Sequence, residues 1–194
     1  MEFKILPPEK AQLLRKSFIR QFVDTAGDHY QKHIATLIPY SDGFYYDGYL
    51  WECLLDNDNY QKMCSMETAA AFLNDKTTVF AMWDLFSNER VRDHKRFSTG
   101  YPKDTVISMQ GTSLAHKITE EWNNEQYAWN NGYQLYDLWL PADIYCFDES
   151  MSWYAIFTHE GWDQFTNPEL DEDAYIRICF LHSQTFCMPY MPRP

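Results

Sequence analysis

Apolar residues recur at helical spacing near the start of the chain. They stand three or four positions apart at Ala11, Leu14, Phe18 and Phe22. This spacing is the period of one face of an α-helix. Pro8 suits the first position of a helix, and Gly27 suits the position just after its end. We therefore predict a helix from about Pro8 to Ala26.

Two later stretches have the same period. The first begins at Ser65, a residue type that favours the N-cap position, and is predicted to end near Asn74. The second is predicted to run from Thr112 to about Asn131, just before Gly132. Its apolar face holds Leu114, Ile118, Trp122 and Trp129.

The C-terminal third has the pattern of β-strands. Two apolar runs, residues 144–147 and 153–159, flank a short polar turn at residues 148–152, which predicts a β-hairpin. In the second run, side chains are predicted to alternate between the two faces of the strand. One face then holds Trp153, Ala155 and Phe157, and the other holds Tyr154 and Ile156.

Further strands are predicted at residues 77–86 and 174–181, which are rich in β-branched and aromatic residues. Together these elements predict an α+β fold, with helices packed on one face of a mainly antiparallel sheet and the C-terminal hairpin at its centre. We expect residues 1–194 to form a single domain. Residues 88–111 are polar and basic and predict a surface excursion, and residues 186–194 hold three prolines and predict an irregular tail.

Composition narrows the classes of function. The chain holds 7 Trp, 14 Tyr and 13 Phe, and its formal net charge is −12. A strongly acidic protein is a poor ligand for DNA, RNA or an anionic membrane, so neither nucleic acid nor membrane is expected as a partner. A basic protein is the partner that this charge favours, since opposite charge speeds encounter. A surplus of carboxylates that merely keeps the protein soluble is the alternative.

Cellular location is predicted from the cysteines and the N-terminus. The five cysteines are odd in number and include no CxxC pair. The first residues resemble no secretory signal, and no apolar stretch has membrane-spanning length. These features favour the cytoplasm, where all five cysteines are expected to remain thiols.

The candidate catalytic pair is His159 and Glu160. A zinc protease motif would require a second histidine four residues after the first, but position 163 is Asp. We therefore expect Thr158, His159 and Glu160 to be structural. His29 and His33 are one helical turn apart, but no carboxylate or cysteine cluster accompanies them in the sequence. No phosphate-binding glycine loop occurs, and no metal or cofactor is expected.

Two elements carry a family resemblance. The first is the sequence Tyr49-Leu50-Trp51, and the second runs from Asp143-Ile144-Tyr145 through Asp148 and Trp153 to Thr158-His159-Glu160. They resemble a family of small bacterial proteins, a domain of unknown function with a YLW element and a DIYxxD…W…THE hairpin. The resemblance implies a bacterial cytosolic protein and brings no activity with it. Within these elements the candidate binding residues are Trp51, Asp148 and Trp153.

Three functions remain open from the sequence. The first is a binding protein, similar in size, acidity and aromatic content to the immunity proteins of bacterial toxin systems, that neutralises a basic protein partner. The second is a small hydrolase or metal-dependent enzyme that uses His159 and Glu160. The third is a structural housekeeping domain. No sequence feature specifies the oligomeric state.

Overall fold

The computed structural model of the chain describes residues 3–35, 49–55, 60–64, 66–83, 105–130, 143–162 and 176–183. Within these ranges, the side chains of residues 60–64, 125–130, 159–162 and 176–177 lie outside the description. No helix of the described part is long and apolar enough to cross a membrane.

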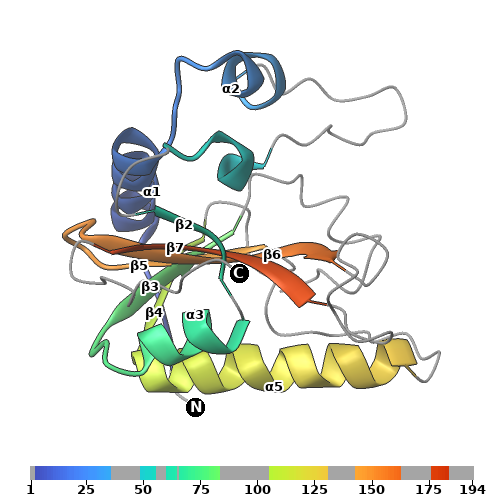
Figure 1. Cartoon of the computed structure of the whole chain (residues 1–194). Helices are drawn as coiled ribbons and strands as arrows, with labels where there is room; N and C mark the ends of the chain where they lie inside the picture. Colours follow the sequence, from blue (N-terminus) through green and yellow to red (C-terminus); the bar gives the residue numbers. More distant parts are fainter. Residues whose placement is uncertain are drawn as a thin grey trace, which may run out of the picture.

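The described strands form one antiparallel sheet (Figure 1). Its order is β1-β4-β3-β5-β6-β7-β2. The strands are β1 Lys4–Ile5, β2 Tyr60–Cys64, β3 Val79–Met82, β4 Ile107–Met109, β5 Ile144–Phe147, β6 Trp153–Trp162 and β7 Ile176–Ser183. Strands from both ends of the chain therefore belong to the same sheet.

The predicted C-terminal hairpin is confirmed and lies at the centre of the sheet. β5 pairs with β6 in a register that places Ile144 opposite Phe157 and Phe147 opposite Tyr154. Asp148 closes the turn, because its carboxylate accepts hydrogen bonds from the Ser152 amide at 2.9 Å and from the Ser152 hydroxyl at 2.8 Å. The alternation predicted for residues 153–157 is confirmed as well: Trp153, Ala155 and Phe157 belong to one core, and Tyr154 and Ile156 to the other.

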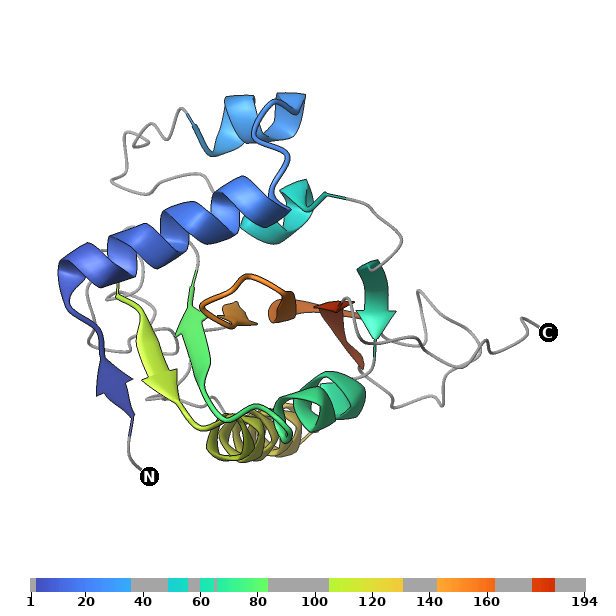
Figure 2. The same ribbon diagram turned by 90° about the vertical axis from the view of Figure 1, so that its left-hand side faces the viewer.

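The helices cover both faces of this sheet, whereas the sequence prediction placed them on one. Helix α1 (Pro8–Phe22) packs on one face, here called the α1 face. Helices α3 (Met66–Leu73) and α5 (Gly111–Asn130) pack on the other, here called the α3–α5 face. Figure 2 shows the sheet between these two layers. The physical reason is that residues 153–158 of β6 are buried on both sides, so each face must be covered.

The first helix ends four residues earlier than predicted. The backbone of Val23 is extended, with φ −115° and ψ 131°, and pairs with Leu54. The Asp24 carboxylate then accepts hydrogen bonds from the amides of Ala26 and Gly27, both at 3.1 Å. This local bonding competes with the helix and turns the chain toward helix α2 (Asp28–His33).

The predicted surface excursion at residues 88–111 is wrong at its C-terminal end. Val106, Ile107 and Met109 are buried, and β4 pairs with both β1 and β3. Three apolar residues in a short strand gave too little pattern to outweigh the polar residues before them. Residues 84–104 and the predicted tail at 186–194 lie outside the described residues.

Candidate functional site

A single 3-10 turn, η1 (Leu50–Cys53), contains Leu50 and Trp51 of the YLW element, has Tyr49 as its N-cap and packs on the α1 face. The Trp51 amide donates a hydrogen bond to the hydroxyl of Tyr145 at 3.0 Å, and Tyr145 is fully buried in the central strand β5. Beyond η1, the Leu55 amide donates to the Phe22 carbonyl at 2.9 Å. η1 is therefore fixed to the centre of the sheet and to the end of α1.

Three aromatic rings lead from the core to the surface at η1. The Trp51 ring stacks on Phe180 of β7, with ring centroids 5.7 Å apart and planes at 25°. The Trp51 ring also stacks with the Tyr49 ring, with ring centroids 5.4 Å apart and planes at 16°. Phe180 is buried, whereas Trp51 and Tyr49 are half-buried. The stacked rings therefore form a large aromatic surface, partly accessible to a partner, at the edge of the core.

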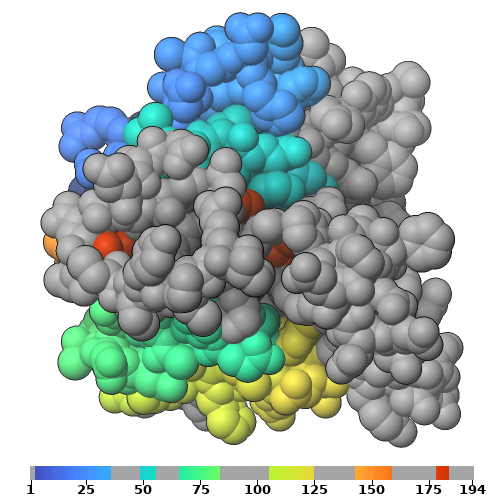
Figure 3. Space-filling model, viewed as in Figure 1, coloured from blue at the N-terminus to red at the C-terminus, as the bar shows by residue number. Residues whose placement is uncertain are grey.

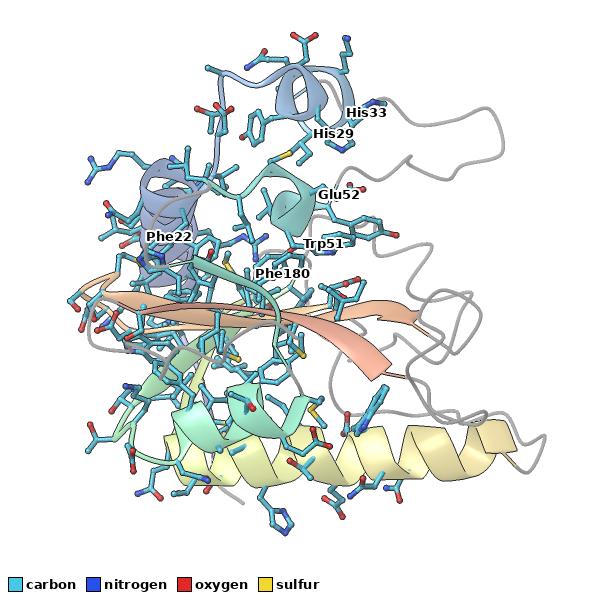
Figure 4. All side chains as sticks on the ribbon, in the orientation of Figure 1. Phe22, His29, His33, Trp51, Glu52 and Phe180 are labelled. Carbon is cyan, nitrogen blue, oxygen red and sulfur yellow. The ribbon has the colours of Figure 1, made fainter. Side chains whose placement is uncertain are left out.

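Glu52 joins η1 to α2. Its carboxylate accepts a hydrogen bond from the Tyr49 amide at 2.9 Å, which closes a capping box around η1. The same carboxylate oxygen lies 3.1 Å from Nε2 of His29, which donates to it when that nitrogen carries a proton. The His33 ring packs on His29 with centroids 4.6 Å apart. Figure 4 shows His29, His33, Glu52 and Trp51 gathered on the same side of η1.

We call Tyr49, Trp51, Glu52 and His29 the η1 surface. α2 and η1 adjoin each other on the face of the molecule drawn in Figure 3. Residues 36–60, which contain η1, hold five carboxylate residues and seven aromatic residues but no Lys or Arg. We call this stretch the acidic aromatic segment. Among the residues of the η1 surface, the sequence prediction names only Trp51 as a binding residue. The local concentration of acidic and aromatic residues is the sequence signal that could have identified the others.

The other two candidate binding residues have structural roles. Asp148 holds the hairpin turn through the hydrogen bonds described above. Trp153 is only 5% exposed and packs against Phe72 of α3, with centroids 5.3 Å apart. The Lys76 ammonium group lies 4.1 Å from the Phe72 ring centroid, over this pair. Neither residue contacts the η1 surface, so of the three candidates only Trp51 lies there.

The candidate catalytic residues lie in an irregular part of β6. Phe157 pairs with Cys179 and Gly161 pairs with Arg177, so β6 has extra residues between these two positions. Thr158 is fully buried, and its hydroxyl donates a hydrogen bond to the Ile178 carbonyl at 2.8 Å, which fits the structural role predicted for it. The side chains of His159 and Glu160 are outside the description, and their predicted role stays a prediction.

Metal binding has little support among the side chains that the structure describes. No group of three or more His, Cys, Asp or Glu residues in this part of the chain is arranged to hold a metal ion. His29 and His33 do share a helix, as their spacing predicted, but their described contacts are with each other and with Glu52.

Comparisons of the chain with models of protein families, with curated proteins and with solved structures found no match. The resemblance carried by the YLW element and the hairpin therefore stays a prediction.

His182 is a buried titratable residue on β7, two positions after Phe180, that the sequence prediction did not select. It is 6% exposed on β7, stacks on Tyr154 with centroids 5.2 Å apart, and contacts Phe22 at 5.3 Å. Its Nδ1 atom has no hydrogen-bond partner within the described structure. Burial lowers the pKa of His182 below its usual value of 6.5, because the charged imidazolium loses its hydration.

This lowered pKa predicts acid sensitivity of the fold. The unfolded chain binds a proton at His182 near pH 6.5, whereas the folded protein resists protonation there. The stability contributed by neutral His182 is therefore complete above that pH and is lost as pH falls toward the lower folded pKa. Between about pH 7 and pH 5 we expect the unfolding free energy of His182→Phe to fall less than that of the wild type, as measured by urea denaturation. Equal losses of unfolding free energy in the wild type and in His182→Phe over this pH range would contradict this account.

Proposed function

We propose that the protein binds a basic protein partner in the cytoplasm and that the η1 surface is the centre of the contact. The observation that carries the proposal is the rigid stack of Tyr49 and Trp51 beside Glu52, inside a segment of the chain that has no Lys or Arg. Neutralisation of a toxin-like protein, as immunity proteins do, is the form of this function that the overall acidity favours.

The chemistry of such a contact follows from the residue types. Half-buried Trp and Tyr side chains supply large contact areas at low cost in conformational entropy, and both are enriched among residues that dominate binding energy. A Lys or Arg side chain from a partner would find an aromatic face and a carboxylate close together. The net charge of −12 would speed the encounter before contact.

The positions of the three binding candidates support Trp51 over the others. Trp51 is backed by Phe180 and fixed through its amide to Tyr145, so its ring needs little ordering when a partner binds. Asp148 and Trp153 already make contacts that hold the hairpin and the α3–α5 face together. Removal of either would disturb folding as well as binding.

The proposal is tested by affinity capture from an extract of the source organism. Immobilised wild-type protein should retain one basic protein at low salt and release it as salt rises through about 0.15 M, where the screening length is roughly 8 Å. Trp51→Ala should reduce retention by at least about 30-fold in affinity, since loss of a central aromatic residue typically costs about 2 kcal/mol or more.

Leu13→Ala is the matched control, because Leu13 is 64% exposed on α1 and does not belong to the η1 surface. It should retain the partner as the wild type does. The proposal would be contradicted if the wild type retained no basic protein, or if Trp51→Ala retained the same proteins as the wild type. Stoichiometric zinc or iron in the purified protein, lost from His159→Ala, would instead favour the enzyme alternative.

A further inference from the structure

Two histidines stand beside the carboxylate of the η1 surface. His29 and His33 lie one turn apart on α2, with ring centroids 4.6 Å apart and planes at 39°. Nε2 of His29 lies 3.1 Å from Oε2 of Glu52, and these two side chains are 43% and 31% exposed. Both can therefore exchange protons with solvent and meet a partner. The charge of this surface depends on whether the imidazoles carry an extra proton.

The two oxygens of Glu52 have different surroundings. Oε2 accepts the hydrogen bond from the Tyr49 amide at 2.9 Å and lies against His29. The contacts that the structure describes for this carboxylate all use Oε2, so Oε1 is the oxygen that a partner can reach. A lysine or arginine bound there would place its positive charge about 3 Å from Oε1. That charge and the His29 ring would then share one carboxylate.

We propose that protonation of His29 and His33 weakens the binding of a basic partner at the η1 surface. This inference rests on the proposed function, because it names the regulation of the same surface. While both imidazoles are neutral, Glu52 gives these three side chains one negative charge. With two imidazolium groups, the same side chains carry one positive charge, and a cation held by Glu52 meets like charge.

The charged groups close to the two histidines keep their charge over the pH range in question. Asp28 and Lys32, both exposed on α2, form an ion pair at 3.2 Å, so their charges cancel. Asp24, in the turn before α2, is bonded to two amides of that turn. Glu52 is the carboxylate that η1 contributes. Carboxyl and ammonium groups ordinarily titrate well outside the range from about pH 5.8 to pH 7.5.

The inner side of α2 adds no titration in this range. Burial raises the pKa of Tyr30 above its usual value of 10.0, and the neighbouring Cys53 raises it further, so the hydroxyl stays neutral. Cys53 itself is buried. Within the described part of α2 and η1, the charge that changes between about pH 7.5 and pH 5.8 therefore belongs to His29 and His33.

The size of the effect follows from the distances. Like charges about 6 Å apart at a protein surface change an affinity on the order of tenfold at low ionic strength. The coupling is reciprocal, so a cation bound at Glu52 also opposes protonation of His29. Binding of the partner and binding of the protons therefore compete at one carboxylate.

The test measures binding of a defined basic peptide, five lysines with both ends blocked, to the full-length protein by NMR. Amide resonances of residues 49–55 report binding at the η1 surface at about pH 7.5 and about pH 5.8, at one low ionic strength because salt screens the contact. We expect the Kd of the wild type to be about tenfold higher at the lower pH. In the double variant His29→Gln/His33→Gln, the two Kd values should agree within about twofold.

His116→Gln is the matched control, because it removes an exposed histidine from α5, on the opposite side of the sheet, and it should keep the wild-type ratio of Kd values. The dispersion of the amide spectrum at the lower pH verifies that each protein is folded. Wild-type Kd values that agree at the two pH values, or equal ratios in the wild type and the double variant, would overturn the inference and leave the proposed function standing. Absence of peptide-induced shifts at residues 49–55 at the higher pH would contradict the proposed function, and the inference with it.

Discussion

Replacing Phe18 with alanine is expected to lower the free energy of unfolding by about 3–5 kcal/mol. Phe18 is completely buried on α1 and contacts four aromatic rings. Their centroids lie 5.1 Å away for Phe22, 5.7 Å for Tyr145, 5.2 Å for Phe147 and 6.0 Å for Tyr154. The variant loses the transfer free energy of the ring and leaves a cavity whose rigid aromatic walls relax little.

Urea denaturation followed by tryptophan fluorescence measures this loss. Phe18→Leu is the matched control, and it should cost less than about 1.5 kcal/mol because most of the buried volume remains. Because Phe18 also contacts Tyr145, whose hydroxyl accepts the hydrogen bond from the Trp51 amide, the alanine variant should also loosen the attachment of η1 to the sheet. Equal stabilities of the alanine and leucine variants would contradict a tightly packed α1 face.

Gly111→Ala is the second substitution with a large expected effect. A Cβ atom at this position would lie 2.0 Å from the Leu73 carbonyl oxygen and 2.6 Å from the Lys76 carbonyl oxygen, both of them backbone atoms. The Gly111 amide also donates a hydrogen bond to the Lys76 carbonyl at 2.9 Å. The start of α5 must therefore move away from the end of α3, at a cost of about 3 kcal/mol in unfolding free energy.

Gly27→Ala is the control for Gly111→Ala. The nearest atom to a Cβ there is Asp24 Oδ2 at 2.8 Å, at the end of a flexible side chain, and the backbone of Gly27 has an ordinary φ of −64°. We expect the unfolding free energy to change by no more than about 1 kcal/mol, because alanine also lowers the conformational entropy of the unfolded chain. Urea denaturation measures this change. A Gly111→Ala protein as stable as Gly27→Ala would show that α3 and α5 do not approach as closely as described.

The central part of the fold was predictable because its signals are local. The hairpin of β5 and β6 follows from two apolar runs and a turn with one aspartate and two serines, and the helical period of α1 is visible in four residues. The burial of both faces was also present in the sequence, since residues 153–157 are all aliphatic or aromatic and include no charged side chain. A strand that faces solvent on one side would alternate apolar and polar residues.

The missed elements depend on distant contacts. β1 has two residues and β4 has three, and each is defined by pairing with strands far away in the chain. The η1 surface is also non-local: Trp51 is fixed by Tyr145, 94 positions away, and stacks on Phe180. Sequence alone identified Trp51 as a binding candidate, but only the fold brings His29 and Glu52 together beside it.

The most direct test of the central claim is hydrogen exchange of the full chain, alone and in complex with the captured basic partner. The account predicts that amides of residues 49–55 exchange more slowly in the complex, because a bound protein would cover the η1 surface. The amides of α3 and α5, on the opposite face of the sheet, should exchange at the same rate in both states. Slower exchange confined to α3 and α5, with residues 49–55 unchanged, would contradict recognition through the η1 surface.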